Sequence, residues 1–342
     1  MDAYSAFCLS LRAHPDIEIR DAVKFMYQSE FGGGHMINDE ASSLLRLKEE
    51  LEAVTFSSAV PMVEPLGEKT ARVNLAAVKG KISAETLNRL FVMSANSVAG
   101  SLDSFLKKLD ILYDFFPKHD IDSYLSSYSA DGYPAVSHTE SYREAYSPSY
   151  RVISAEFVPI LPILAEIDAK RPRLVAIDGR CASGKTTLSN TLSKIYDCNI
   201  FHADDFFLPP EMRTTDRLST PGGNLHRERL YDEILLPIKE KRTAFYRKFF
   251  CDSCTLSDYI AAPDKALNIV EGSYSMHPEL FDMYDLRIFL DIDKDLQLSR
   301  LRLRESEESL ATFISRWIPL EEAYFSVYGI RSRADVVISA RS

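Results

Sequence analysis

Residues 174–186 read Leu-Val-Ala-Ile-Asp-Gly-Arg-Cys-Ala-Ser-Gly-Lys-Thr and decide the expected fold of the second half of the chain. They begin with an apolar run that is typical of a buried strand, and a helix-forming run, Thr187–Ile195, follows them. Between the two lies the pattern G-x-x-x-x-G-K-[ST], whose glycines let the backbone wrap a phosphate chain with its N–H groups pointing inward. The helix that follows adds the positive end of its dipole. The stretch therefore predicts a strand, a phosphate-binding loop and a helix.

The loop residues suggest specific contacts with a nucleotide. Lys185 is expected to reach the β- and γ-phosphates of ATP, and the Thr186 hydroxyl is expected to ligate Mg²⁺. A chance glycine turn before a helix is the alternative. Cys181 is expected to be a filler side chain, although a thiolate stabilised by the loop is also conceivable. The candidate nucleotide-binding residues are Gly179, Arg180, Cys181, Ala182, Ser183, Gly184, Lys185, Thr186 and Thr187.

Composition limits the class of protein. With 342 residues, of which 46% are hydrophobic, the chain can bury two domain cores. No apolar run approaches about 18 residues, and Met1–Tyr4 lacks the features of a signal peptide, so no membrane span or secretion is expected. Five cysteines, an odd number, favour a reducing cytoplasm over a disulfide framework. A net charge of −10 argues against a nucleic-acid partner.

The first half of the chain is expected to be mostly helical. In Asp16–Glu30, the apolar residues Ile19, Val23 and Met26 recur at helical spacing. Similar apolar stripes predict further helices at Glu40–Val54, Ser83–Ser94 and Ser101–Phe116. The three glycines at 32–34 follow a helix, and no Gly-Lys pair closes them. They are either a helix stop or a backbone that approaches a ligand beside His35.

Asp131–Arg151 differs from the rest of the first half, because tyrosines and arginines crowd there among prolines. Such a segment is either an interface between the two halves or a binding site for an anionic or aromatic ligand. We place the domain boundary near residue 150. The expected division is a helical domain of unknown role, residues 1–150, and a nucleotide-binding domain, residues 151–342.

Short apolar runs separated by helical segments replace the helical pattern after residue 173. Such an alternation predicts a parallel α/β sheet, whose ligands bind beyond the carboxyl ends of the strands. The expected strands are Leu174–Ile177, Asn199–His202, Leu267–Val270, Leu286–Leu290 and Val336–Ile338.

Acidic residues follow two of these strands. Asp204 and Asp205 come after Asn199–His202, and Glu271 comes directly after Leu267–Val270. Phosphoryl transfer to a hydroxyl needs a carboxylate near that hydroxyl and a metal ion that neutralises charge. One aspartate can therefore accept the proton of the acceptor while the other faces Mg²⁺, and Glu271 can orient the metal or the acceptor. The alternatives are a turn or helix cap for the aspartates and a solvated strand end for Glu271.

Arg300 and Arg304 lie four residues apart and share one face of an expected helix. Two arginines beside a phosphate site suggest a lid that stabilises the transferring charge. A solvated helix face is the alternative.

Roughly residues 173–340 resemble the uridine kinase and nicotinamide riboside kinase branch of small-molecule P-loop kinases. The resemblance implies an α/β, P-loop NTPase fold: a parallel sheet with flanking helices and a lid, here preceded by a mostly α-helical domain. It also implies that Asp204 is the general base and that Arg300 and Arg304 are the cations of the lid, while Lys185 of the phosphate loop remains a catalytic candidate from the loop pattern itself. The segments that carry it are the phosphate loop, Asp204–Phe207, Glu271-Gly272, Leu298–Glu305, Arg316–Pro319, Tyr324-Phe325 and Ala334–Val337.

The chain departs from this family in the acceptor region. The family's Asn-Phe-Asp-His-Pro compares here with Gly-Asn-Leu-His-Arg at 223–227, which keeps His226 and places Leu225 at the acidic position. Tyr246 matches a tyrosine of the family's base-contacting run, whereas Cys251 stands at the position of its histidine. The resulting candidates for acceptor binding are Asp205, His226, Tyr246 and Glu271, and those for Mg²⁺ are Thr186, Asp205 and Glu271.

The leading hypothesis is an ATP- and Mg²⁺-dependent kinase for a hydroxyl of a small molecule, of a uridine kinase-like type. One alternative is an ATP-dependent switch, in which the nucleotide controls a site on the helical domain. Another is a bifunctional enzyme with separate chemistry near His35 and His138. An oligomer is compatible with the sequence, which does not reveal the number of subunits.

Overall fold

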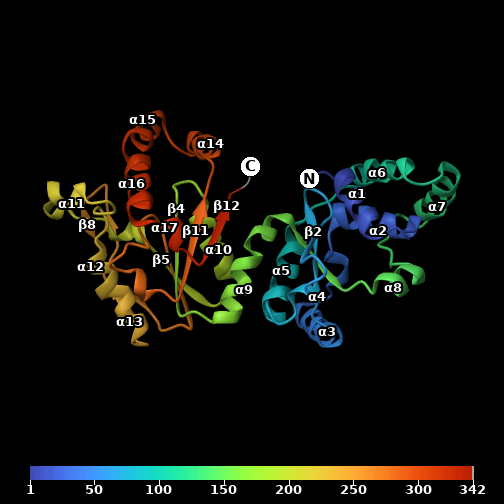
Figure 1. The fold of residues 1–342 in the computed structure, drawn as a ribbon, viewed down its shortest axis with the longest axis horizontal. Coiled ribbons are helices and arrows are strands. Elements are labelled where there is room, and N and C mark those ends of the chain that lie inside the picture. The colour runs from blue at the N-terminus through green and yellow to red at the C-terminus, as the bar shows by residue number, and fades with distance from the viewer. Residues whose placement is uncertain (341–342) are drawn as a thin grey trace. The chain divides into compact units, whose positions relative to one another are not determined.

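The computed structural model describes residues 1–340, which form two compact units divided between Asp168 and Ala169 (Figure 1). None of the helices in this described part of the chain is long and apolar enough to span a membrane.

The first unit is built mainly from helices, as expected. The four predicted helices are present, although the one predicted at Ser101–Phe116 is α-helical only to Leu109 and continues as 3₁₀ helix to Asp114. Further helices were not predicted individually, among them Ala3–Ala13 and Lys118–Ala130. The α-helices are α1 (Ala3–Ala13), α2 (Ile19–Phe31), α3 (Glu40–Ala53), α4 (Leu75–Val78), α5 (Ala84–Ser97), α6 (Leu102–Leu109), α7 (Lys118–Ala130), α8 (Glu140–Tyr146) and α9 (Leu161–Lys170), whose last two residues belong to the second unit. Short segments of 3₁₀ helix lie at Gly34–Met36, Asp110–Asp114 and Ala155–Ile160.

A three-stranded antiparallel sheet in the first unit was not predicted. Its strands are β1 (Val63–Pro65), β2 (Thr70–Asn74) and β3 (Tyr150–Ser154), in the order β1-β2-β3. The central strand β2 pairs Arg72 with Val152 across the sheet. Strands this short give little periodic signal, and the pairing of β2 with β3 joins segments far apart in the chain.

The glycine run acts as a helix stop. Helix α2 ends at Phe31, and the N–H of Gly32 bonds the carbonyl of Gln28 at 3.0 Å. Gly33 packs so closely on the Phe91 ring that a Cβ would lie 2.5 Å from a ring carbon. These contacts explain the glycines by packing within the unit.

The tyrosine-rich segment packs into the core of the first unit. Tyr142 is buried, and the ring of His138 stacks on it with centroids 4.2 Å apart. His138 also bonds the Asp21 carboxylate through Nδ1 and the Tyr150 hydroxyl through Nε2, both at 2.7 Å. Burial lowers the pKa of His138 to about 4, so the imidazole is neutral there. These aromatic residues are therefore explained by packing inside one unit.

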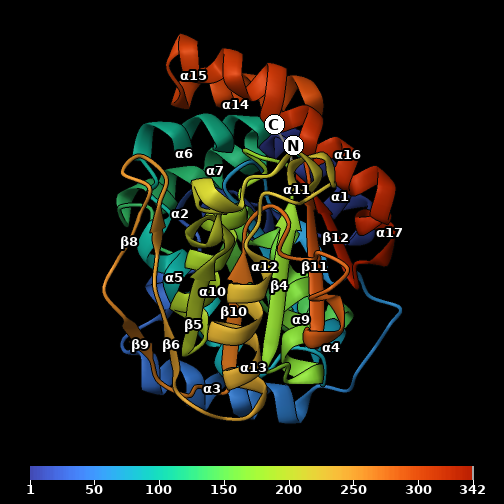
Figure 2. The same cartoon turned by 90° about the vertical axis from the view of Figure 1, so that its left-hand side faces the viewer.

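The second unit contains a five-stranded parallel sheet in the order β12-β11-β4-β10-β5, which confirms the predicted fold class (Figure 2). All five strands match the predicted ones closely. They are β4 (Leu174–Gly179), β5 (Cys198–His202), β10 (Leu267–Glu271), β11 (Leu286–Asp291) and β12 (Val336–Ser339). Strand β4 is central and buried along its whole length, as expected for a strand covered on both faces.

Helices and short strands surround this sheet. Helix α10 (Lys185–Ile195) follows the phosphate loop, and α14 and α15 lie beyond one end of the sheet (Figure 2). The other α-helices are α11 (Thr215–Ser219), α12 (Arg227–Leu230), α13 (Leu236–Lys239), α14 (Lys294–Arg304), α15 (Glu307–Thr312), α16 (Ile318–Tyr328) and α17 (Ile330–Arg333). Antiparallel pairs form between β6 (Ala244–Tyr246) and β9 (Ile260–Ala262), and between β7 (Phe249–Phe250) and β8 (Thr255–Leu256).

Candidate active site

The phosphate loop connects β4 to α10. Its curl comes from positive φ angles at Gly179 (142°), Ala182 (60°) and Gly184 (101°). The Lys185 ammonium lies across the loop, where it donates to the carbonyls of Gly179 at 2.7 Å and Arg180 at 3.0 Å. The loop thus has the curled backbone and the cation that a polyphosphate chain requires.

Thr186 and Glu271 meet at the carboxyl ends of neighbouring strands. The Thr186 hydroxyl donates to Oε1 of Glu271 at 3.0 Å. Glu271 ends β10, which pairs with β4, and the sheet buries its side chain. The Nδ1 atom of His202, the last residue of β5, lies 2.6 Å from the same carboxylate oxygen. This hydrogen bond raises the pKa of His202 above its usual value.

His202 was not among the residues predicted for the site. The signal available in the sequence was its position at the end of a predicted strand, since ligands bind at that edge of a parallel sheet. Its contact with Glu271 depends on the pairing of β5 with β10, which the sequence alone does not show.

The two aspartates after β5 face different partners. Asp204 keeps part of its side chain open to solvent, yet desolvation by surrounding protein raises its pKa, and the carboxylates of Glu271 and Glu321 add to that effect. The nearby Lys185 ammonium acts in the opposite direction. Asp205 instead forms an ion pair with Lys248 at 3.1 Å. Of the pair, Asp204 is therefore the carboxylate that shares its surroundings with Lys185 and Glu271.

The two arginines of α14 also differ. Arg300 donates to the carbonyl of Ala182 in the phosphate loop at 3.1 Å. Arg304 bonds Glu305 at 2.6 Å, and more than half of its side chain is exposed. Gln297, one turn before Arg300, donates to the carbonyl of Cys181 at 3.1 Å and was not predicted. In this structure α14 thus contacts the loop through Arg300 and Gln297.

His226 and Tyr246 both lie against Phe206, next to the aspartate pair. The backbone N–H of His226 bonds the Phe206 carbonyl at 2.6 Å, and its imidazole is 3.2 Å from Glu228. Tyr246 is buried, and its ring stacks on Phe206 with centroids 6.0 Å apart. The two residues therefore flank the segment that carries Asp204.

The oxygen atoms at Thr186 and Glu271 fit a magnesium ion that arrives with a nucleotide. Within residues 1–340, no group of three or more His, Cys, Asp or Glu side chains could hold a metal ion alone. Mg²⁺ commonly takes only one or two protein oxygens and completes its shell with phosphate and water. The Thr186 hydroxyl beside the Glu271 carboxylate is such a donor set, whereas Asp205 is paired with Lys248.

Cys181 behaves as a filler side chain. It is buried, and Gln297 lies 3.1 Å from its sulfur. Burial, with the negative charge of Glu321, raises the pKa of the thiol to about 12. A thiol with so high a pKa is not a reactive thiolate at neutral pH.

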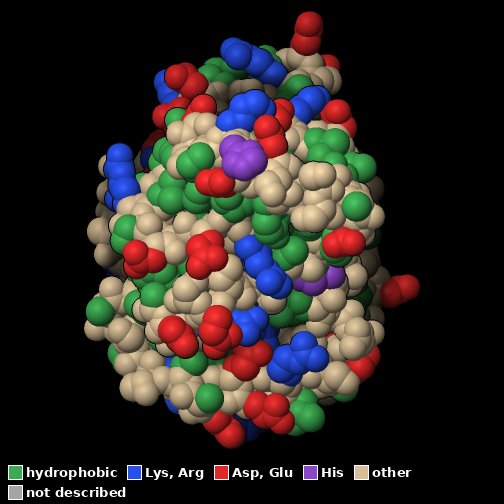
Figure 3. All heavy atoms as spheres, turned by 90° about the vertical axis from the view of Figure 1, so that its right-hand side faces the viewer, with side chains coloured by type: hydrophobic (Ala, Val, Ile, Leu, Met, Phe, Trp, Pro, Cys, Tyr) green, Lys and Arg blue, Asp and Glu red, His purple; other side chains and the backbone are tan. Residues whose placement is uncertain are grey.

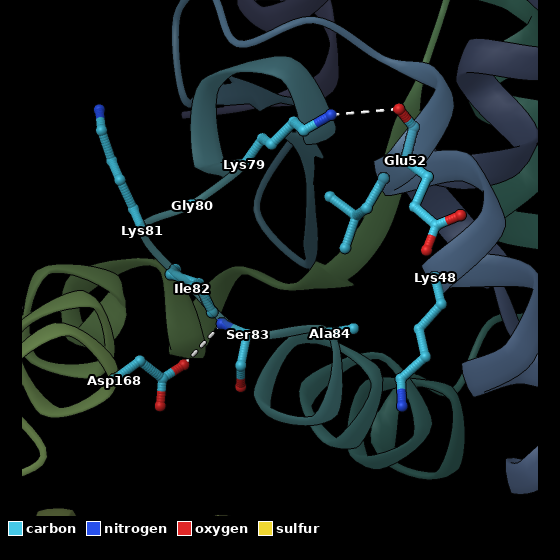
Figure 4. A pocket seen from close by; sticks show the side chains of 10 residues that line it. Lys48, Glu52, Lys79, Gly80, Lys81, Ile82, Ser83, Ala84 and Asp168 are labelled. Atoms are coloured by element: carbon cyan, nitrogen blue, oxygen red, sulfur yellow. Dashed lines mark hydrogen bonds between the residues drawn. The ribbon is translucent and has the colours of Figure 1, made fainter.

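The first unit has a hollow of about 510 Å³, shown in Figure 4. Lys48, Lys79 and Lys81 line it. Figure 4 shows Lys79 reaching the Glu52 carbonyl, at 3.1 Å, and the N–H of Ser83 reaching Asp168, at 2.7 Å. Lys48 pairs with Glu85, and Lys81 lies over the Phe56 ring. The lysines are thus used in contacts within the unit.

Charged side chains are mixed over the face of the molecule drawn in Figure 3. Basic and acidic side chains alternate there, with hydrophobic ones between them. An extended basic surface would be expected of a protein that binds nucleic-acid backbones, and this face does not present one among the described residues.

Comparison with curated proteins identifies relatives of about half of the chain. The uridine kinase of Staphylococcus aureus strain JH9 is 26% identical over 187 residues, which cover 49% of this chain and 88% of that kinase. About half of the chain is similar to uridine kinases. The expected resemblance is thereby confirmed for that half, and it supports a kinase-like, nucleotide-binding function. No model of a known protein family matches the chain.

Comparison with solved structures finds kinases as well. A possible uridine kinase from Bacillus stearothermophilus is 21% identical, with a TM-score of 0.38, over 48% of this chain and 87% of that one. Shikimate kinase from Bacteroides thetaiotaomicron is 16% identical, with a TM-score of 0.27, over 49% of this chain and 85% of that one.

Proposed function

We propose that the protein is an ATP- and Mg²⁺-dependent kinase that transfers the γ-phosphoryl group to a hydroxyl of a small molecule. The observation that carries this proposal is the contact of Thr186 with Glu271, 3.0 Å apart, at the start of the helix that follows the phosphate loop. Asp204 lies close enough to Glu271 and Lys185 for both charges to act on it. The similarity to uridine kinases supports the same reaction class.

Each residue of the site has a role in this reaction. The backbone of the loop and Lys185 hold the phosphates of ATP, and Thr186 with Glu271 holds Mg²⁺. When bound, Mg²⁺ neutralises charge on the phosphates. His202 fixes the orientation of the Glu271 carboxylate through their 2.6 Å contact. Arg300 lies against the loop, where a guanidinium can stabilise the transferring phosphoryl group.

Asp204 is proposed as the general base. Its raised pKa makes the carboxylate a stronger base than an aspartate in water, which favours removal of a proton from the acceptor hydroxyl. Its partial exposure leaves room for an acceptor to approach. Asp205 is less suited to this role because its carboxylate pairs with Lys248.

A nucleoside-like acceptor is the first candidate, because the relatives are uridine kinases. Leu225 is fully buried and forms a backbone bridge with Phe207, so it presents no polar group to a ribose. An anionic acceptor is less favoured, because Arg227 pairs with Glu279 and Arg229 pairs with Glu233. A neutral acceptor that bonds through groups other than residue 225 agrees best with these contacts.

The test is phosphoryl transfer by the purified full-length protein with Mg²⁺ and ATP. Pools of nucleosides, ribosides and other hydroxyl compounds would be screened by mass spectrometry for products heavier by one phosphoryl group. A phosphorylated product that disappears with Asp204→Asn would support the proposal. Tight ATP binding without transfer to any hydroxyl would instead favour the ATP-dependent switch.

A further inference from the structure

One carboxylate of α16 bridges the phosphate loop and the segment that follows Glu271. Oε2 of Glu321 accepts the backbone N–H of Cys181 at 2.9 Å. Oε1 of the same side chain accepts the hydroxyl of Ser273 at 2.6 Å. Ser273 stands two residues after Glu271, so the bridge joins the loop that precedes Thr186 to the segment that follows Glu271.

Glu321 is buried without a cation. Only 6% of the residue is exposed, and the described part of the chain offers it no ion pair with lysine or arginine. Arg180, a cation of the phosphate loop, pairs with Glu322 and Asp291 instead. A buried carboxylate without a cation has a high desolvation cost, which two neutral donors offset only in part. An apolar residue would avoid that cost but would make neither hydrogen bond, so the two bonds are what the carboxylate contributes at this position.

The backbone of the loop is held from outside at consecutive residues. Glu321 takes the N–H of Cys181, and Gln297 donates to the carbonyl of the same residue at 3.1 Å. Arg300 donates to the next carbonyl, that of Ala182. Glu321 also reaches across to the β10 side of the site through Ser273. Together with the hydrogen bond from Thr186 to Glu271, this bridge connects the phosphate loop and its helix to the end of β10.

We propose that Glu321 is a positioning residue for phosphoryl transfer, whose bridge from Cys181 to Ser273 sets the spacing between the phosphate loop and Glu271. In this proposal the 3.0 Å contact of Thr186 with Glu271 depends on that spacing, since Thr186 follows Cys181 by five residues and Glu271 precedes Ser273 by two. The proposal rests on the kinase function proposed above. It assigns to Glu321 no contact with ATP or the acceptor.

Two substitutions separate the bridge from the charge. In Glu321→Gln the amide oxygen can accept the Cys181 N–H, and the amide nitrogen can donate to the Ser273 hydroxyl, so the bridge is kept without the charge. In Glu321→Ala both bonds are lost. Calorimetry of ATP binding, with Mg²⁺ and with EDTA, would measure how much Mg²⁺ increases the affinity. We expect Glu321→Ala to reduce the Mg²⁺-dependent increase in ATP affinity about tenfold, because the oxygens of Thr186 and Glu271 are no longer held close enough to bind one Mg²⁺ ion. Glu321→Gln should retain that increase within about threefold.

Turnover gives the second measurement. A displacement of about 1 Å between catalytic groups lowers rates by on the order of 100-fold. With an acceptor from the screen, Glu321→Ala should therefore lower kcat about 10- to 100-fold while the KM for ATP changes less than about threefold, because Lys185 and the rest of the loop remain. Ser273→Ala should lower kcat by a smaller factor than Glu321→Ala does. The double variant should have nearly the same kcat as Glu321→Ala alone, because both substitutions remove the same bridge.

Glu322→Gln is the matched control, because it changes the adjacent carboxylate of α16. Arg180 keeps its ion pair with Asp291 in that variant, so wild-type values are expected. Loss of thermal stability in Glu321→Ala with an unchanged Mg²⁺ effect and unchanged kcat would overturn the proposal. So would a Glu321→Gln variant as impaired as Glu321→Ala. If the wild type binds ATP but phosphorylates nothing, the kinase proposal fails, while the calorimetric comparison still decides the role of Glu321.

Discussion

The close approach of β4 to β11 leads to a prediction whose size follows from the structure. A Cβ on Gly179 would lie 2.1 Å from the carbonyl oxygen of Leu290, a backbone atom near the end of the neighbouring strand β11, and the φ angle of Gly179 is 142°. Gly184, in the same loop, has a φ of 101°, but a Cβ there would meet nothing within 4 Å. Alanine at position 184 therefore introduces backbone strain alone, whereas alanine at position 179 introduces both backbone strain and a steric clash.

The expected magnitudes follow from these two effects. An alanine held at a φ that suits only glycine costs about 1–3 kcal/mol, and this applies to both positions. Forcing a methyl group into close-packed backbone adds about 1–3 kcal/mol at Gly179 alone. We therefore expect Gly184→Ala to lower the free energy of unfolding by about 1–3 kcal/mol and Gly179→Ala by about 2–6 kcal/mol.

Urea unfolding of the full-length protein would measure both values. The single tryptophan of the chain, Trp317, lies in the second unit, so its fluorescence reports the unfolding of the unit that contains both glycines. Equal destabilisation by Gly179→Ala and Gly184→Ala would refute the reasoning, because it would mean that β4 and β11 do not approach as closely as described.

Two further predictions concern the site and the first unit. Lys185→Ala should abolish measurable ATP binding in calorimetry, whereas Asp204→Asn should keep ATP affinity within about threefold and lower kcat at least about 100-fold; normal transfer by Asp204→Asn would exclude it as the base. His138 has a folded pKa of about 4, below its usual value near 6.5, so stability should fall as pH drops through that range, by up to about 3 kcal/mol. Hydrogen exchange of the first unit between pH 4 and 7 would measure how its free energy of unfolding depends on pH. The dependence should be weaker in His138→Gln, and it must be absent if His138 is charged in the native protein.

The sequence by itself determined the phosphate loop and the fold class of the second unit. The strand, loop and helix at Leu174–Ile195 are contiguous, so their pattern is local and needs no knowledge of distant contacts. The three inner strands β4, β10 and β11 are short, mostly apolar runs because the sheet is covered on both faces there. The helices of the first unit were likewise readable, since helical periodicity is a local property.

Tertiary structure alone decided which members of each candidate pair contribute to the site. Asp204 and Asp205 are adjacent in sequence, yet Lys248, from a distant segment, takes the carboxylate of Asp205. Arg300 and Arg304 share a helix face, but only the position of Arg300 brings it to the Ala182 carbonyl.

The contacts of His202 and Glu321 also required the folded structure. His202 reaches Glu271 across the pairing of β5 with β10, and Glu321 reaches Cys181 from a helix 140 positions later in the chain. The pairing of β2 with β3 in the first unit likewise joins segments that lie far apart in the sequence. Such contacts depend on packing between segments far apart in sequence, and no local pattern records which distant segment will lie beside a given residue.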